Sequence, residues 1–198
     1  MKRNTRTRLL LNMFLVAFAL CCSCKKAIRT PAEMTAYVNE PKNGLKVSQQ
    51  AGKIETSVTY KPWQMMALNR GKDTAALHGL KNKLFFVLSL SANHKELLRQ
   101  LKFSDYSEMV QVLAFRMGDY VSAVPDRGKA VPPEECLFQQ TYGMGSANQL
   151  LLVFDKAKFE HVKQAEIRIK EFGLNTGNLD YCFNLEDINE LQDIALHH

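Results

Sequence analysis

The strongest strand in this sequence of 198 residues is expected at Lys83-Leu84-Phe85-Phe86-Val87-Leu88-Ser89-Leu90-Ser91. Successive side chains of a strand point to opposite faces of its sheet. Here Leu84, Phe86, Leu88 and Leu90 share one face, while Phe85 and Val87 lie on the other. Apolar residues on both faces predict a strand that is central in its sheet and covered on both sides.

Alternation of apolar and polar residues recurs on both sides of this stretch and predicts further half-buried strands. They are expected within residues 45–48, 54–60, 120–124, 137–142, 149–154, 165–169 and 179–185. Two segments have the composition of hairpin turns, Gln50-Ala51-Gly52-Lys53 and Gly143-Met144-Gly145-Ser146. The strands do not alternate regularly with helices, so an antiparallel arrangement is expected.

A few short helices are expected between the strands. Pro62 can open a helix that carries Trp63, Met66 and Ala67 on one face. Asn93 and Glu96 have the spacing of a capping box and predict a helix that buries Leu97, Leu98 and Leu101. A longer helix is expected from Ser104 or Asp105 to Gly118, and a short one near residues 156–162. The expected fold is therefore mainly β, an antiparallel two-layer sandwich with two or three inserted short helices. The alternative is an α+β domain with helices on one face of a sheet.

The N-terminal segment has the composition of a bacterial secretion signal. Lys2, Arg3, Arg6 and Arg8 precede an apolar run of 12 residues, Leu9–Leu20. A membrane-spanning helix needs about 20 apolar residues, whereas the apolar part of a signal peptide has about 7 to 15. The sequence therefore favours a cleaved signal over a transmembrane anchor.

A cysteine at the end of this segment is expected to carry lipid. Cys24 follows the small residue Ser23, which suits the cleavage step better than Cys22 after Cys21. Cys24 is therefore preferred over Cys22 as the lipidated residue, and ordinary cleavage near residues 17–19 is the alternative. The resulting division is a signal peptide at 1–23, a tether at 24–43 and one globular β-rich domain at 44–198.

The balance of charged residues and the number of cysteines change once the signal segment is set aside. Four of the 26 basic residues and none of the 20 acidic residues lie in residues 1–23, which leaves 22 basic residues against 20 acidic ones. No block of like charge remains, so nucleic acid is not an expected partner. Of the five cysteines only Cys136 and Cys182 remain in the domain. They can form a disulfide in an oxidising compartment if the fold brings them together, or they are two unrelated thiols.

The remaining residues show no catalytic pattern. None of the five histidines has metal-ligand spacing to another ligand residue, so no metal site and no cofactor are expected. Asn and Asp residues around 175–180 lack the spacing of a calcium loop. Gly143-Met144-Gly145 precedes a strand, which argues against a phosphate-binding loop. Trp63 is interpreted as a core residue, with an exposed aromatic surface for glycans, formed with Tyr60, as the alternative.

Several short segments together resemble a family of uncharacterised lipoproteins from Bacteroidota-type bacteria. They are Tyr37-Val38-Asn39, Asn43-Gly44-Leu45, Val58-Thr59-Tyr60-Lys61-Pro62, Phe85-Phe86-Val87-Leu88, Tyr142-Gly143-Met144 and Leu151-Leu152-Val153-Phe154-Asp155. The resemblance implies a lipidated envelope protein and carries no active site to transfer. In such bacteria acidic residues after the lipidated cysteine resemble a signal for export to the cell surface. Here Lys25 and Lys26 follow Cys24 instead, which favours the outer membrane with the domain facing the periplasm.

These features predict a non-enzymatic protein that is held in the cell envelope by N-terminal acyl chains in the lipid bilayer. The expected role is to bind another envelope protein, as an accessory of an assembly or secretion machine. A surface lipoprotein that binds a glycan or another ligand is the alternative, and it depends on exposed aromatic residues around Trp63.

Overall fold

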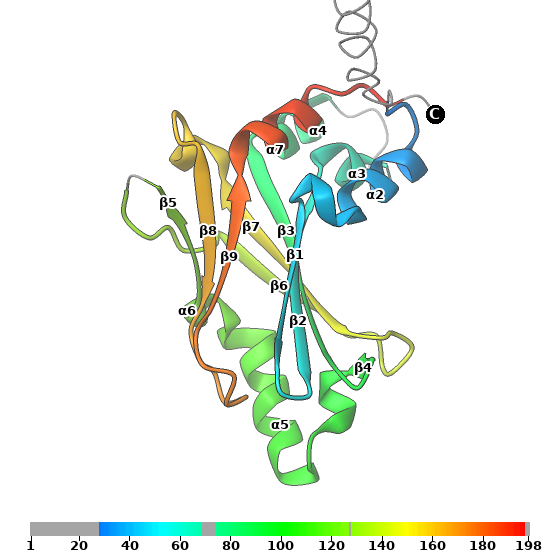
Figure 1. The fold of residues 1–198 in the computed structure, drawn as a ribbon, viewed down its shortest axis with the longest axis vertical. Helices are drawn as coiled ribbons and strands as arrows, with labels where there is room; N and C mark the ends of the chain where they lie inside the picture. Colours follow the sequence, from blue (N-terminus) through cyan, green and yellow to red (C-terminus); the bar gives the residue numbers. More distant parts are fainter. Residues whose placement is uncertain (1–27, 69–73, 127, 197–198) are drawn as a thin grey trace, which may run out of the picture.

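The strands of this protein form two antiparallel sheets (Figure 1). The computed structural model describes residues 28–68, 74–126 and 128–196. The larger sheet has the order β1-β2-β3-β7-β6, with β4 paired to β3. Its strands are β1 (Lys46–Ala51), β2 (Ile54–Lys61), β3 (Lys83–Ala92), β4 (Lys95–Glu96), β6 (Glu135–Gln139) and β7 (Asn148–Asp155). The smaller sheet has the order β5-β8-β9, formed by β5 (Val121–Pro125), β8 (Gln164–Ile169) and β9 (Leu179–Asn184).

Short helices gather at the two ends of the long axis (Figure 1). One end, called here the helical end, carries α2 (Pro31–Asn39), α3 (Trp63–Ala67), α4 (Thr74–Lys81) and α7 (Leu185–Gln192). The opposite end, called the distal end, carries α5 (Phe103–Gln111). Single helical turns and short segments complete the fold: η1 (Pro41–Asn43), η2 (Leu97–Gln100), η3 (Val112–Arg116), α6 (Met117–Tyr120) and η4 (Lys156–Phe159).

The strand predicted at Lys83–Ser91 is confirmed as a central strand. β3 pairs along its length with β2 on one side and β7 on the other, for example Phe86 with Tyr60 and with Leu152. The predicted hairpin between β1 and β2 is also confirmed, with Ala51 opposite Ile54. The strand-rich, antiparallel, sandwich-like architecture expected from the alternation is therefore the observed one.

The main core lies between the two sheets. Phe86 of β3 has its ring centroid 5.0 Å from that of Phe183 of β9, 5.6 Å from that of Tyr60 and 6.1 Å from that of Phe154. All four rings are buried. A buried hydrogen bond between Thr56 Oγ1 and Tyr181 Oη also joins the sheets, at 2.5 Å. Aromatic side chains bury large apolar areas, so this cluster accounts for much of the attraction between the layers.

A second apolar layer covers the outer face of the larger sheet. Phe85 and Val153 point away from the main core and pack with Leu80 of α4, and Trp63 and Met66 of α3 lie against them. The helices α3 and α4 thus explain why β3 is apolar on both faces.

The expected tether contains a folded segment. Residues 31–39 form α2, whose Met34 and Val38 are buried against the domain. Thr30 and Glu33 make a capping box, in which Thr30 Oγ1 accepts from the backbone N–H of Glu33. The few apolar residues of this segment show no sustained helical period in the sequence, yet α2 packs on the domain ahead of residue 44, where the globular part is predicted to start. The boundary at Cys24 lies outside the described residues.

The helix predicted from Asn93 is wrong. Asn93 and His94 have φ angles of 52° and 58° and form the two-residue turn between β3 and β4. Such hairpin turns need positive φ at both central residues, a conformation that Asn tolerates well. Glu96 is therefore not a capping residue, and the leucines that follow it are buried by the single turn η2.

The helix predicted from Ser104 or Asp105 is present, but it begins at Phe103 with Lys102 at the N-cap position, and its later course also differs. After α5, the five residues of η3 adopt π-helical geometry, and α6 continues the chain through Gly118 to Tyr120. Met109, Leu113 and Met117 are buried as their spacing predicts, whereas Phe115 is 84% exposed.

Candidate functional site: a pocket at the helical end and a surface at the distal end

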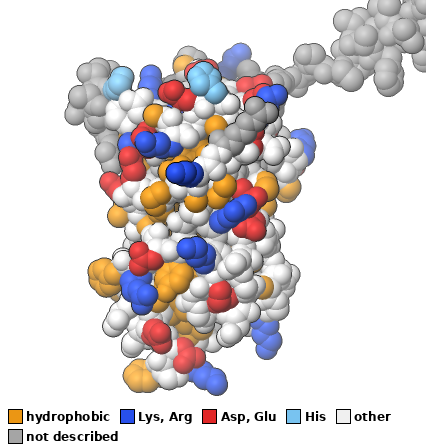
Figure 2. Space-filling view, turned by 90° about the vertical axis from the view of Figure 1, so that its left-hand side faces the viewer, with side chains coloured by type: hydrophobic (Ala, Val, Ile, Leu, Met, Phe, Trp, Pro, Cys, Tyr) orange, Lys and Arg blue, Asp and Glu red, His pale blue; other side chains and the backbone are white. Residues whose placement is uncertain are grey.

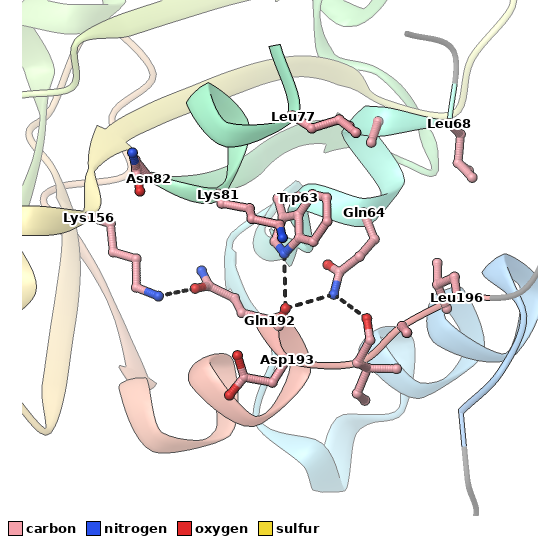
Figure 3. A pocket seen from close by; sticks show the side chains of 13 residues that line it. Trp63, Gln64, Leu68, Leu77, Lys81, Asn82, Lys156, Gln192, Asp193 and Leu196 are labelled. Atoms are coloured by element: carbon pink, nitrogen blue, oxygen red, sulfur yellow. Dashed lines mark hydrogen bonds between the residues drawn. The ribbon is translucent and has the colours of Figure 1, made fainter. Parts of the chain in front are cut away.

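A pocket of about 770 Å³ opens at the helical end, between α3, α4 and the chain that leaves α7 (Figure 3). Ala67, Leu68, Leu77 and Leu196 supply apolar lining. Volumes of about 300 to 1,000 Å³ are usual for sites that bind small molecules. The volume falls within this range, and the lining combines apolar and polar side chains.

The wall of the pocket is built by α3, which caps the end of α7. Gln64 Nε2 donates to the carbonyl oxygens of Leu191, Gln192 and Ile194 at 2.8, 3.1 and 2.9 Å. Trp63 Nε1 donates to the Gln192 carbonyl at 3.0 Å. The last carbonyls of a helix lack their usual partners within the helix. Trp63 and Gln64 supply donors at and just beyond the end of α7, where the Leu191 carbonyl also accepts from the backbone N–H groups of Asp193 and Ile194. Gln64 is buried, and its Oε1 has no hydrogen-bond partner among the described residues.

Two lysines supply positive charge to the pocket. The Lys81 ammonium lies 4.7 Å from the centroid of the Trp63 ring, within the range of a cation–π contact. Lys156 donates to Gln192 Oε1, and Gln192 Nε2 donates to Tyr60 Oη at 3.2 Å. No ion pair joins either lysine to a carboxylate within the described parts of the chain.

Aromatic residues around Trp63 do not form the exposed surface considered from the sequence. Tyr60 is buried in the main core, where burial raises its pKa well above the ordinary value. Trp63 is half-buried: it packs on the second apolar layer and lines the pocket, with Lys81 over its ring. The interpretation of Trp63 as a packing residue is thus correct, and its indole also faces a cavity.

The distal end carries a second feature, a surface formed by Phe103, Tyr106, Tyr142 and Met144 and called here the distal surface. Their exposed fractions are 93%, 42%, 83% and 88%. Phe103 and Tyr106 belong to α5, and the other two belong to the loop between β6 and β7. Tyr106 and Tyr142 line the same small pocket of about 310 Å³ beside Arg99.

A buried carboxylate holds this loop in place. Glu96 is 3% exposed, and it accepts hydrogen bonds from the backbone N–H groups of Gly143 and Gly145, both at 2.9 Å, and from Thr141 Oγ1. Burial by itself raises the pKa of Glu96, but these bonds and the nearby Arg99 outweigh it and lower the pKa below its ordinary value. The glycine-rich loop thus binds an anion, and that anion is the chain's own carboxylate.

The two domain cysteines lie on different sheets. Cys136 is in β6 of the larger sheet and partly buried, and Cys182 is in β9 of the smaller sheet and exposed. The buried neighbours of Cys182, Tyr181 and Phe183, point inward, so its thiol points away from the larger sheet. Both thiols are free, and the structure does not bring the considered disulfide pair together.

The cysteines expected to carry lipid, Cys24 and Cys22, lie outside the described residues. No group of three or more His, Cys, Asp or Glu side chains within residues 28–68, 74–126 and 128–196 could hold a metal ion. Across the same ranges, none of the helices combines the length and apolarity that crossing a membrane requires.

No family model, curated protein or solved structure matches this chain.

Proposed function

We propose that this chain is a non-enzymatic envelope lipoprotein, anchored through acyl chains on Cys24, that binds another envelope protein through its distal surface. The observation that carries the proposal is the position of that surface. Four apolar or aromatic side chains are exposed on two neighbouring segments: α5, at the end of the domain opposite α2, and the loop between β6 and β7, which shares the small pocket beside Arg99 with α5 (Figure 1).

The covalent chain limits how far the domain can lie from its anchor. Cys24 precedes Thr30, the N-cap residue of α2, by six residues. A fully extended chain of that length spans at most about 20 Å. Lipid on Cys24 would therefore hold the helical end near the bilayer and direct the distal surface away from it.

The composition of the distal surface suits a protein partner. Aromatic residues, Met and Arg are enriched at protein interfaces, and a few such residues carry most of the binding energy. Tyr106, Tyr142, Met144 and Arg99 lie on or beside this surface. On the face seen in Figure 2, acidic and basic side chains are interspersed, and hydrophobic side chains reach the surface between them, including at the lower end.

The distal surface is also organised before any partner binds. Glu96 fixes the loop that carries Tyr142 and Met144, and Arg99 Nη1 donates to the Gly143 carbonyl at 3.1 Å. A preorganised surface loses less conformational entropy on association. The π-helical segment η3, which follows α5, belongs to a geometry that is frequent at functional sites.

A photo-crosslinking experiment in intact cells tests the proposal. A photoreactive amino acid at Met144 should yield one specific crosslinked envelope protein, and the combined change Phe103→Ser, Tyr106→Ser and Tyr142→Ser should abolish that product. The control variant Phe115→Ser with Leu137→Ser removes apolar side chains that are 84% and 51% exposed but lie outside the distal surface. It should leave the product unchanged. No specific product, or equal loss in both variants, would refute partner binding at this surface.

A separate measurement tests whether the N-terminal cysteine is lipidated. Mass spectrometry of the N-terminal peptide should show acyl chains on Cys24, and Cys24→Ser should release the protein from membranes whereas Cys22→Ser should not. An unmodified N-terminus near residue 20 would instead support ordinary cleavage.

A further inference from the structure

We propose that the pocket at the helical end binds an anionic amphiphile, a molecule with a carboxylate or phosphate head and an alkyl chain. The inference concerns a different surface from the distal one and does not depend on partner binding. It stands on the juxtaposition of two lysines and an apolar wall within one cavity of about 770 Å³.

The charges of the pocket favour an anion. Lys81 and Lys156 both line it, and within the described residues neither forms an ion pair with a carboxylate. Asp193 is the acidic residue among the lining residues, and in Figure 3 its carboxylate lies on the α7 side of the pocket, away from Lys81 and Trp63. Lys156 is half-buried, whereas Lys81 is exposed. An ammonium without a counter-charge attracts a carboxylate or phosphate oxygen, and the attraction is stronger where water is partly excluded.

The other lining residues favour an alkyl chain. Ala67, Leu68, Leu77 and Leu196 form apolar lining, and Trp63 contributes the body of its indole. Leu68 is a large apolar side chain that remains 36% exposed. Each methylene group of a ligand that leaves water for such a wall makes binding more favourable. A small hydrophilic anion would leave this wall uncovered.

The contacts that Lys81 and Lys156 make in the structure can be replaced by contacts to an anionic ligand. Lys156 donates to Gln192 Oε1, a neutral amide, and Lys81 rests on the Trp63 ring. An anion is a stronger partner than either, because it adds the attraction between opposite charges to the hydrogen bond of the ammonium. Binding would therefore draw both ammonium groups toward the ligand head and would change the surroundings of Trp63.

Trp63 reports this change directly, since it is the single tryptophan of the chain. The full chain, kept in one uncharged detergent throughout, is titrated with decanoate and with decyl phosphate below their micelle concentrations while Trp63 emission is recorded. We expect a saturable shift with at least one of the two, and the tighter of them identifies the preferred head. Decanol should bind at least about 10-fold more weakly, and acetate and inorganic phosphate should cause no shift.

Matched variants test the two lysines. Lys81→Gln and Lys156→Gln keep a hydrogen-bond donor and remove the charge, and each should weaken binding about 5-fold, the effect expected for a partly exposed ion pair. Lys158→Gln is the control, because Lys158 lies two residues from Lys156 on η4, is exposed and does not line the pocket. The proposal is overturned if neither amphiphile shifts the emission, if decanol binds as tightly, if acetate or phosphate alone reproduces the shift, or if the double lysine variant binds like Lys158→Gln.

Discussion

The buried carboxylate of Glu96 offers the sharpest test of how this fold positions its distal surface. Glu96→Ala removes the acceptor of three hydrogen bonds, from Thr141, Gly143 and Gly145. Glu96→Gln keeps the shape and one oxygen. That oxygen can replace Oε1, which accepts from Thr141 and Gly145, but the amide nitrogen then faces the N–H of Gly143.

The magnitudes follow from the number of bonds lost. A hydrogen bond to a charged group contributes about 1.5 to 3 kcal/mol, and a buried donor left without a partner costs about 1 to 3 kcal/mol. We therefore expect Glu96→Gln to lower the free energy of unfolding by about 2 kcal/mol. Glu96→Ala leaves three donors to find water or remain unpaired, and we expect it to cost about 4 kcal/mol.

The pH dependence has a definite sign. The pKa of Glu96 in the folded protein lies below its ordinary value of 4.5. The unfolded chain therefore binds a proton more readily, so stability from this group is present above pH 4.5 and is lost as pH falls through the folded pKa. The difference between wild type and Glu96→Gln should accordingly be largest near pH 7 and shrink toward pH 3.

Urea denaturation across this pH range measures these differences, with Glu160→Gln as the control because Glu160 is exposed. Hydrogen exchange of the Gly143 and Gly145 amides should accelerate in Glu96→Ala, since their acceptor is gone. The reasoning is refuted if Glu96→Gln is as stable as Glu160→Gln, or if its deficit does not depend on pH.

Three further predictions concern other parts of the fold. Burial raises the pKa of Glu171, but backbone N–H groups of its turn outweigh this and lower the pKa to about 2, so its stabilising effect should be present above pH 4.5 and lost as pH falls toward 2. A carboxyl titration followed by NMR with a midpoint near 4.5 would contradict this. Gln64→Leu removes a side-chain donor from the carbonyls of Leu191, Gln192 and Ile194, but Leu191 keeps backbone donors and Gln192 keeps Trp63 Nε1. The Ile194 carbonyl is left without its donor, so the change should cost about 1 to 3 kcal/mol in urea denaturation, against almost none for the exposed Gln50→Leu. Cys136 and Cys182 should both be alkylated in the unfolded, unreduced protein, and in the folded protein Cys136 should react more slowly because burial raises its pKa to about 11. A peptide containing both cysteines joined by a disulfide would disprove the arrangement of the sheets around them.

Local patterns in the chain were sufficient to predict most of the strands. The alternation in β2, β3 and β8 reports which side chains face the core, because neighbouring residues of a strand always point to opposite faces. The same local signal failed at Asn93, where a capping-box spacing coincided with a hairpin turn. Leu185, Ile188 and Leu191 have helical spacing and are all buried, but no helix is predicted from the sequence in this segment, which forms α7.

The candidate sites could not be predicted from local patterns, because the residues that form each site are far apart in the sequence. Glu96 binds a loop 45 to 49 residues away, and Gln64 caps a helix 127 to 130 residues away. Nothing near Gln64 or Glu96 in the chain indicates which groups will lie opposite them.

The sequence alone therefore determined the strand-rich antiparallel layers, the nearly balanced charge of the domain and the expectation of a lipid anchor, since these depend on residue type and local spacing. Only the tertiary structure decided that Lys81, Lys156 and Trp63 share a pocket, and that Tyr106 and Tyr142 line another. The physical reason is that side chains distant in the chain meet only where the sheets and helices pack, and that packing is a property of the whole fold.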